Sequence, residues 1–83
     1  MMNRHEVTSP LPGVFYRRPE PGTPEFVQVG QTVAAEETVG LIEIMKSFHT
    51  VSAGVSGTVV EIMAESESEV EPGQVLVAIE DGT

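Results

Sequence analysis

Three apolar runs rich in β-branched residues predict the main strands of the protein. They lie at 39–44, 55–62 and 75–80, and each is bounded by Gly, Pro or acidic residues, as strands commonly are. No window of ten or more residues has the i, i+3, i+4, i+7 apolar spacing of an amphipathic helix. Gly and Pro recur along the chain and also disfavour long helices. The pattern therefore predicts an all-β fold of several short strands joined by tight turns.

Two short motifs recur along the chain and predict two similar halves. Gly13 and Gly57 each precede an aliphatic or aromatic segment and lie 44 residues apart, while the Gly-Gln turns at Gly30 and Gly73 lie 43 residues apart. The nearly equal spacings predict a pseudo-twofold relation. Each half alone is too small to bury its apolar face, so we expect the halves to pack as a sandwich or a flattened barrel.

A proline-rich segment at 19–25 is predicted to be a loop or protrusion. It holds three of the six prolines, and proline has no amide hydrogen for an interior ladder. The aromatic and aliphatic residues at 15–16 and 26–27 are expected to anchor its two ends in the core. The arginines at 17–18 are candidates either for contact with an anionic partner or for an ion pair with Glu20.

The composition is that of one small globular domain. The chain has 83 residues, of which 40% are hydrophobic, and it contains no cysteine. Disulfides, thiol chemistry and zinc ribbons are thereby excluded, and two histidines without a cysteine disfavour a structural zinc site. The apolar stretches are only a few residues long, which predicts no transmembrane helix. Because the N-terminal residues lack an apolar signal region, we expect a cytoplasmic protein.

The charge balance is strongly acidic. Thirteen acidic residues stand against four basic ones, for a net charge of −9. Such a surface repels phosphate backbones and anionic lipids, so nucleic-acid and membrane-surface roles are disfavoured. Acidic residues are dense over 61–71, where they form either a solvated face or a guide for a basic partner. A domain this small has little room for a deep catalytic pocket, so we expect a binding or carrier module without catalytic residues.

Lys46 is the only lysine of the chain and lies between the two predicted halves. If the segments on its two sides pair as a hairpin, Met45 and Lys46 occupy the tip. Met-Lys is a poor pair for a type I′ turn, which prefers Asn-Gly or Asp-Gly, and poor turn residues are often kept at functional sites. An exposed lysine is a suitable target for acylation by an enzyme with an activated donor. The alternative is an ordinary surface lysine.

The sequence Glu43-Ile44-Met45-Lys46 is similar to the Glu-x-Met-Lys attachment motif of biotinyl domains, whereas lipoyl domains usually have Asp before the lysine. The segments at 13–21, 26–31, 54–59 and 70–76 resemble those of the biotin carboxyl carrier proteins of bacterial-type acetyl-CoA carboxylase. In that family a proline-rich insertion called the thumb corresponds to about 19–25 here. The resemblance covers about residues 8–81, within a single domain of residues 1–83.

The resemblance implies a fold and a mechanism. The fold is a barrel-sandwich hybrid of two four-stranded antiparallel sheets with a protruding thumb. A biotin protein ligase would attach biotin to Lys46 and recognise Glu43, Ile44, Met45 and Ser47. The domain would then act as a swinging carrier of carboxybiotin between biotin carboxylase and carboxyltransferase in fatty-acid synthesis. It would be a non-catalytic subunit without a bound metal, and its thumb would cover the biotin ring.

Two alternatives remain open at this point. A lipoyl carrier shares the fold and the lysine, although Met45 and the proline-rich insertion count against it. The other is an unmodified scaffold or adaptor domain of the same fold. Ile44, where the family usually has Ala, and Ser47, where it often has Met, keep that interpretation open.

Overall fold

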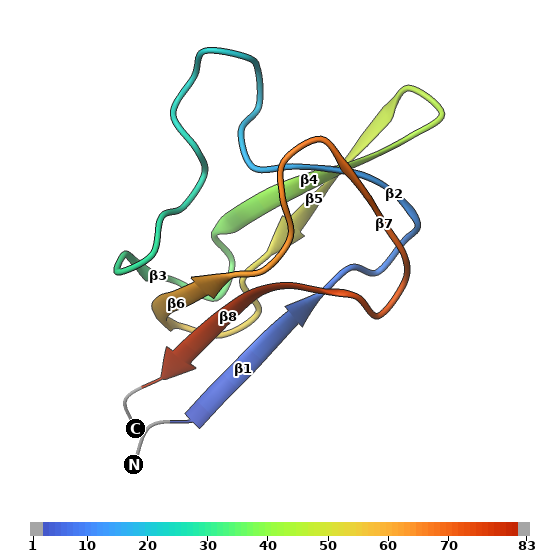
Figure 1. The fold of residues 1–83 in the computed structure, drawn as a ribbon. Coiled ribbons are helices and arrows are strands. Elements are labelled where there is room, and N and C mark those ends of the chain that lie inside the picture. Colours follow the sequence, from blue (N-terminus) through green and yellow to red (C-terminus); the bar gives the residue numbers. More distant parts are fainter. Residues whose placement is uncertain (1–2, 82–83) are drawn as a thin grey trace.

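The computed structural model describes residues 3–81, which form eight strands (Figure 1). The strands are β1 (Asn3–Thr8), β2 (Gly13–Tyr16), β3 (Thr32–Val33), β4 (Thr38–Ile44), β5 (Ser47–Ser52), β6 (Gly57–Ile62), β7 (Ser68–Val70) and β8 (Val75–Asp81). The three predicted apolar strands are confirmed as β4, β6 and β8. None of the described residues belongs to a helix that could cross a membrane.

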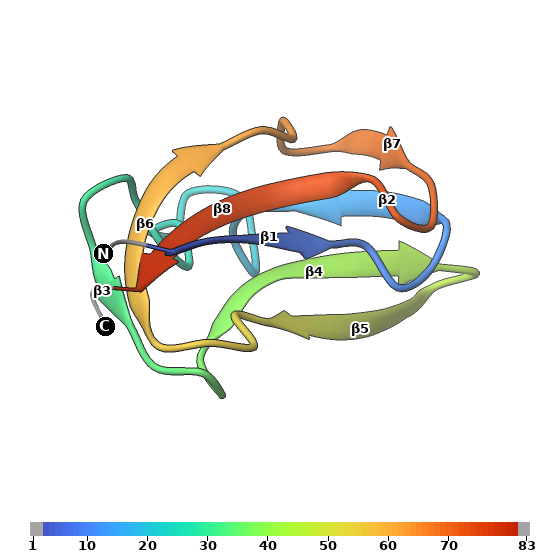
Figure 2. The same cartoon turned by 90° about the horizontal axis from the view of Figure 1, so that it is seen from below.

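The strands form two four-stranded antiparallel sheets that pack face to face (Figure 2). One sheet has the order β1-β8-β6-β3 and the other has the order β5-β4-β2-β7. Each sheet keeps two edge strands, so the sandwich does not close into a barrel. The predicted sandwich of two four-stranded sheets is therefore confirmed.

Apolar side chains from both sheets fill the space between them. The largest fully buried ones are Phe15, Ile42, Leu76, Ile79, Val39, Val59 and Val77. Gly40 on β4 lies directly against the Phe15 ring, where a Cβ atom would overlap it. The absence of a side chain at this position leaves room for the ring of the largest core residue against β4.

The two halves of the chain are related by a pseudo-twofold. Each of the strands β1 to β4 has a counterpart four strands later in the chain, from β5 to β8. Exchanging every strand for its counterpart converts the strand order of one sheet into that of the other. Residues of β1 and β2 have counterparts 44 positions later, while residues of β3 and β4 have counterparts 37 positions later. Hydrogen bonds agree with this numbering. The Gly30 amide donates to the Val59 carbonyl at 2.7 Å, and the Glu67 amide donates to the Phe15 carbonyl at 2.6 Å.

The predicted equivalence of the two Gly-Gln turns is wrong, although that of Gly13 and Gly57 is correct. The counterpart of Gly30 is Glu67, and the counterpart of Gly73 is Glu36. The spacing falls from 44 to 37 residues between β2 and β3, a difference of seven. The proline-rich segment at 19–25 lies in this connection and has the same length. It is thus an insertion into the first half that has no counterpart in the second. Because of it, the spacing between equivalent residues of the two halves is not constant along the chain.

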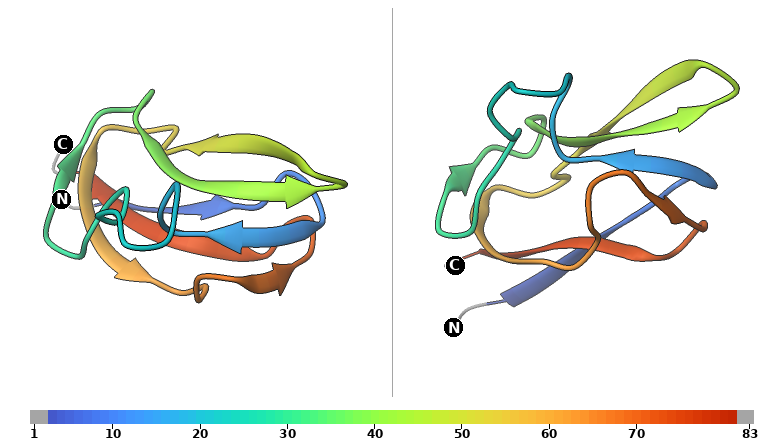
Figure 3. Two further views of the ribbon diagram at one scale, coloured as in Figure 1. Left: turned by 90° about the horizontal axis from the view of Figure 1, so that it is seen from above. Right: turned by 45° about the horizontal axis from the view of Figure 1, so that its top comes forward.

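The two described ends of the chain lie together at one end of the molecule, and the tip of the β4–β5 hairpin lies at the other (Figure 3). Asn3 pairs with Asp81 across β1 and β8. The inserted segment rises on the same side of the sandwich as the hairpin (Figure 1). The hairpin and the insertion are therefore the two features that project from the body.

Candidate functional site

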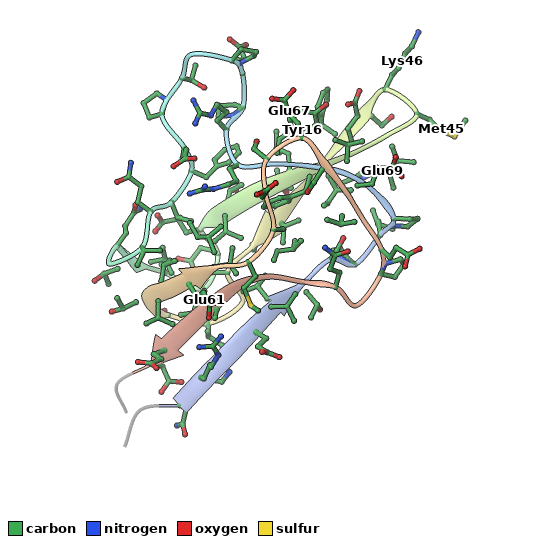
Figure 4. All side chains as sticks on the ribbon, in the orientation of Figure 1. Tyr16, Met45, Lys46, Glu61, Glu67 and Glu69 are labelled. Carbon is green, nitrogen blue, oxygen red and sulfur yellow. The ribbon has the colours of Figure 1, made fainter. Side chains whose placement is uncertain are left out.

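The β4–β5 hairpin places Lys46 at its tip. Ile44 pairs with Ser47, so the connection is a two-residue turn of Met45 and Lys46. Both turn residues have positive φ, 49° and 69°, as a type I′ turn requires. Residues with a Cβ atom are strained in this region. Met45 is 93% exposed and Lys46 is exposed as well, and both side chains point away from the body (Figure 4). The predicted tip is confirmed.

Alternation along β4 determines which hairpin residues face the core. Ile42 is fully buried and Ile44 packs against the buried cluster. Glu43 lies between them and faces outward on the opposite side of the strand. The last pairing of β2 with β4 is at Glu43, so the turn extends beyond the support of β2. Core packing thus holds the strand up to Ile44 and leaves the next three residues in solvent.

Glu43 is held by an aromatic pair that the sequence analysis did not identify. The Tyr16 hydroxyl donates to Glu43 Oε1 at 2.8 Å. The rings of Tyr16 and Phe48 are tilted by 57° with centroids 6.0 Å apart, and Phe48 is the cross-strand partner of Glu43. The hydrogen bond to Glu43 raises the pKa of Tyr16 above its ordinary value, with further contributions from burial and from the charge of Glu67. Tyr16 therefore stays a protonated donor at neutral pH.

The inserted segment, called the thumb below, is closed at its base by one carboxylate. Glu25 accepts from Arg17 Nη2 at 3.0 Å and from Arg18 Nη2 at 3.3 Å. The Phe26 amide also donates to the Arg17 carbonyl at 2.7 Å. The ion pair expected with Glu20 is not formed, because the path of the loop brings Glu25 to both arginines instead. The Glu20 backbone exchanges hydrogen bonds with Thr23 in the thumb's own turn. The predicted anchoring is confirmed, since Phe15 and Val27 are buried and Tyr16 and Phe26 are half-buried.

A groove of about 340 Å³ lies between the thumb and the hairpin. The side chains that line it come from β2, the thumb and its base, β4, β5 and the turn before β7. They are Tyr16, Arg18, Pro19, Glu20, Pro21, Glu43, Phe48, Ser66 and Glu67. No motif in the sequence indicates this groove, because its walls come from four separate stretches of the chain.

The five residues predicted for attachment and recognition lie on one hairpin but do not share one environment. Met45, Lys46 and Ser47 are exposed at the tip, whereas Glu43 and Ile44 are half-buried. Within residues 3–81 no three His, Asp or Glu side chains gather in a cluster that could hold a metal ion. The tip offers one primary amine, and the geometry around it suits a covalent attachment point rather than a catalytic centre.

Comparison with known proteins identifies the family. A family model described as biotin-requiring enzyme, of the biotin and lipoyl attachment type, matches residues 5–79. The chain belongs to the biotinyl/lipoyl family. Membership agrees with the two-sheet sandwich described above.

Curated relatives of this biotinyl/lipoyl domain are carrier proteins. The biotin carboxyl carrier protein of acetyl-CoA carboxylase from Nostoc sp. is 45% identical over 74 residues, covering 89% of this chain and 41% of the relative. The protein of the same description from Pseudomonas aeruginosa is 38% identical over 78 residues, covering 94% and 50%. The chain thus spans about half the length of these relatives or less.

Solved structures give the same fold. The Kluyveromyces lactis urea carboxylase matches with a TM-score of 0.77 and 28% identity, over 93% of this chain and 6% of that one. A single-chain, multi-domain long-chain acyl-CoA carboxylase matches with a TM-score of 0.78 over 96% of this chain and 7% of that one. At 19% identity the second match shows the fold alone.

Proposed function

We propose that this chain is the biotin-carrying domain of a biotin carboxyl carrier protein of acetyl-CoA carboxylase, with biotin attached to Lys46. One observation carries the proposal: the only lysine of the chain is exposed at a hairpin tip with the sequence Glu-Ile-Met-Lys. The curated relatives are described as carrier proteins of acetyl-CoA carboxylase, which supports the assignment to this carboxylase. Its role in fatty-acid synthesis and a cytoplasmic location belong to the same proposal.

The hairpin tip suits a covalently attached prosthetic group. Lys46 would hold biotin through an amide between its Nζ atom and the valerate carboxyl group. When bound, biotin supplies the chemistry for carrying an activated carboxyl group, and the protein supplies placement. The exposed turn leaves the lysine side chain free to extend into the active site of a second protein.

The chain's own residues keep the lysine in a fixed place on a rigid body. Packing of Ile44 against the core and the pairing of β4 with β5 hold the base of the tip. Biotin carboxylase and carboxyltransferase are the proposed partners that load and unload the carrier. Attachment to one body keeps the group at a high effective concentration at both active sites. This domain contributes no catalytic residue.

A biotin protein ligase is the third proposed partner. Met45 and Ser47 flank Lys46 in solvent, and they would form the direct contact surface for the ligase. Glu43 and Ile44 would act by setting the shape of the hairpin, because Ile44 packs inward and Glu43 is bound by Tyr16. Each of the four residues beside Lys46 would thus have its own role in recognition by the ligase.

Intact-mass measurement tests the proposal. The protein is co-expressed with a biotin protein ligase in the presence of free biotin, and the peptide containing Lys46 is mapped. We expect one biotinyl increment per chain on Lys46 and none in Lys46→Arg, which should keep its unfolding midpoint. A lipoyl increment would assign the chain to the lipoyl carriers. An unmodified chain with the cognate ligase would favour an adaptor role.

A further inference from the structure

The groove between the thumb and the hairpin combines aromatic rings with carboxylates in its lining. Its floor is formed by Tyr16 and by Phe48, which is 57% exposed although it is a phenylalanine. Pro19 and Pro21 form the thumb wall. The ring surface of Tyr16 and Phe48 at the groove is therefore open to stacking with a group from another molecule.

The groove has an excess of negative charge. Glu20, Glu43 and Glu67 line it, and none of the three is in a salt bridge within residues 3–81. The one cation in the lining, Arg18, is already paired with Glu25. Figure 4 shows Glu67 next to Tyr16 on the side of the hairpin base, where its charge contributes to the raised pKa of Tyr16. An anionic occupant is therefore disfavoured, and a cation is favoured.

Aromatic rings together with carboxylates fit the guanidinium of arginine better than the ammonium of lysine. A guanidinium is planar, stacks on an aromatic face and donates two parallel hydrogen bonds to a carboxylate. An ammonium is more strongly hydrated and makes less use of a ring. The tilted pair of Tyr16 and Phe48 presents ring surface to the groove, with Glu43 and Glu67 beside it.

We propose that this groove receives an arginine side chain of an enzyme that docks against the hairpin, with the guanidinium stacked on the Tyr16–Phe48 pair and bound by Glu43 and Glu67. The identity of the docking enzyme rests on the proposed carrier function, but the groove's preference for a guanidinium does not. The arginine would fix the orientation of the domain while Lys46 enters the enzyme's active site.

A titration followed by amide NMR shifts tests the groove directly. The probe is N-acetyl-arginine amide, added to the isotope-labelled, unmodified protein at low salt. We expect saturable shifts at Tyr16, Phe48 and Glu67, with a Kd on the order of 1 mM. N-acetyl-lysine amide should bind more weakly, and neutral N-acetyl-citrulline amide should give no saturable shift. Shifts that grow linearly and spread over all acidic segments would overturn the proposal.

Two variants and one matched control sharpen the test. Glu67→Gln should weaken binding of the arginine probe about two- to fivefold, and Phe48→Leu should weaken it by a similar factor. Glu69→Gln removes another exposed carboxylate from the same acidic segment but outside the groove lining, and it should leave the Kd unchanged. An equal loss in Glu67→Gln and Glu69→Gln would reduce the effect to net charge and would refute the site.

Enzyme assays connect the groove to the carrier cycle. Glu67→Gln should raise KM about two- to fivefold for the biotin protein ligase or for biotin carboxylase and leave kcat unchanged, whereas Glu69→Gln should change neither. The biotinylated protein must still bind the probe, because loss of binding would mean that the prosthetic arm fills the groove. If Lys46 is biotinylated but the probe does not bind, only the docking proposal fails. If the probe binds and Lys46 stays unmodified, the carrier function fails instead.

Discussion

Glu67 occupies, in the second half of the molecule, the position that Gly30 occupies in the first. Both residues have positive φ, 64° for Glu67 and 94° for Gly30. Glycine adopts this conformation without cost, whereas a residue with a Cβ atom is strained there by on the order of 1–3 kcal/mol. The second half therefore keeps a strained glutamate at the edge of the groove, where the first half has a glycine.

Replacing Glu67 by glycine should stabilise the domain. Relief of the strain exceeds the added entropy of the unfolded chain, which is about 0.4–1 kcal/mol, so we expect a net gain of about 0.5–1 kcal/mol. For a domain of this size that corresponds to a rise of roughly 2–8 °C in Tm. Thermal unfolding followed by circular dichroism measures it. Glu65→Gly is the control and should lower Tm, because Glu65 does not have positive φ.

Met45→Asn should also stabilise the protein while impairing its modification. Asn is favoured in the first position of a type I′ turn, and Met45 is so exposed that its side chain contributes no packing. We expect a higher Tm together with a biotinylation rate lowered by about tenfold, equivalent to a lost contact of about 1.4 kcal/mol. Timed intact-mass measurement with the ligase gives the rate. An unchanged rate would show that the ligase does not contact Met45.

Tyr16 offers a direct test of its bond to Glu43. It is the only tyrosine and the chain has no tryptophan, so phenolate absorbance reports on this group alone. The midpoint should lie above 10.0 because the Glu43 hydrogen bond, burial and the Glu67 charge raise the pKa. Glu43→Gln should lower it and Glu69→Gln should not.

The raised pKa of Tyr16 also predicts that the protein loses folding stability at high pH. The pKa of Tyr16 is higher in the folded than in the unfolded protein, so the folded state favours the protonated phenol. This contribution is fully present below pH 10 and is lost as the pH rises through the folded-state pKa. Urea unfolding above pH 10 should therefore show a smaller decline in Glu43→Gln than in the unaltered protein. An equal decline in both would contradict the assignment.

Glu25→Gln should loosen the thumb without unfolding the domain. The substitution removes the charge that binds Arg17 and Arg18 at the thumb base. We expect the global free energy of unfolding to fall by about 1 kcal/mol or less. Hydrogen exchange at the Thr23 and Phe26 amides, which are hydrogen-bonded within the thumb and its base, should become faster. Glu20→Gln is the control and should leave the Phe26 amide protected.

Local pattern was sufficient to predict much of the fold. The β-branched runs predicted β4, β6 and β8, and pairing of the segments on both sides of Met45 and Lys46 predicted the tip of the hairpin. Strand β1 was missed because its exposed edge position leaves it polar, with only Val7 buried. The register of the repeat was misread because the thumb shifts all later positions by seven residues.

The groove could not be read from the sequence. Tyr16, Glu43 and Glu67 meet only through the pairing of β2 with β4 and the turn that precedes β7. Nothing in local composition tells which carboxylate a tyrosine will bind, and the choice of Glu25 over Glu20 at the thumb base was likewise determined by the path of the loop. Such contacts depend on tertiary geometry rather than on the spacing of residues.

The adjacency of Asn3 and Asp81 gives the domain a mechanical polarity. A pull applied through the two ends would act on the first hydrogen bonds between β1 and β8 and break them one pair at a time, as a zipper opens. Because β4 and β5 belong to the other sheet, the lysine-bearing hairpin would carry none of this load at first. Tension on the chain would separate β1 from β8 first, while the β4–β5 hairpin that bears Lys46 stayed folded.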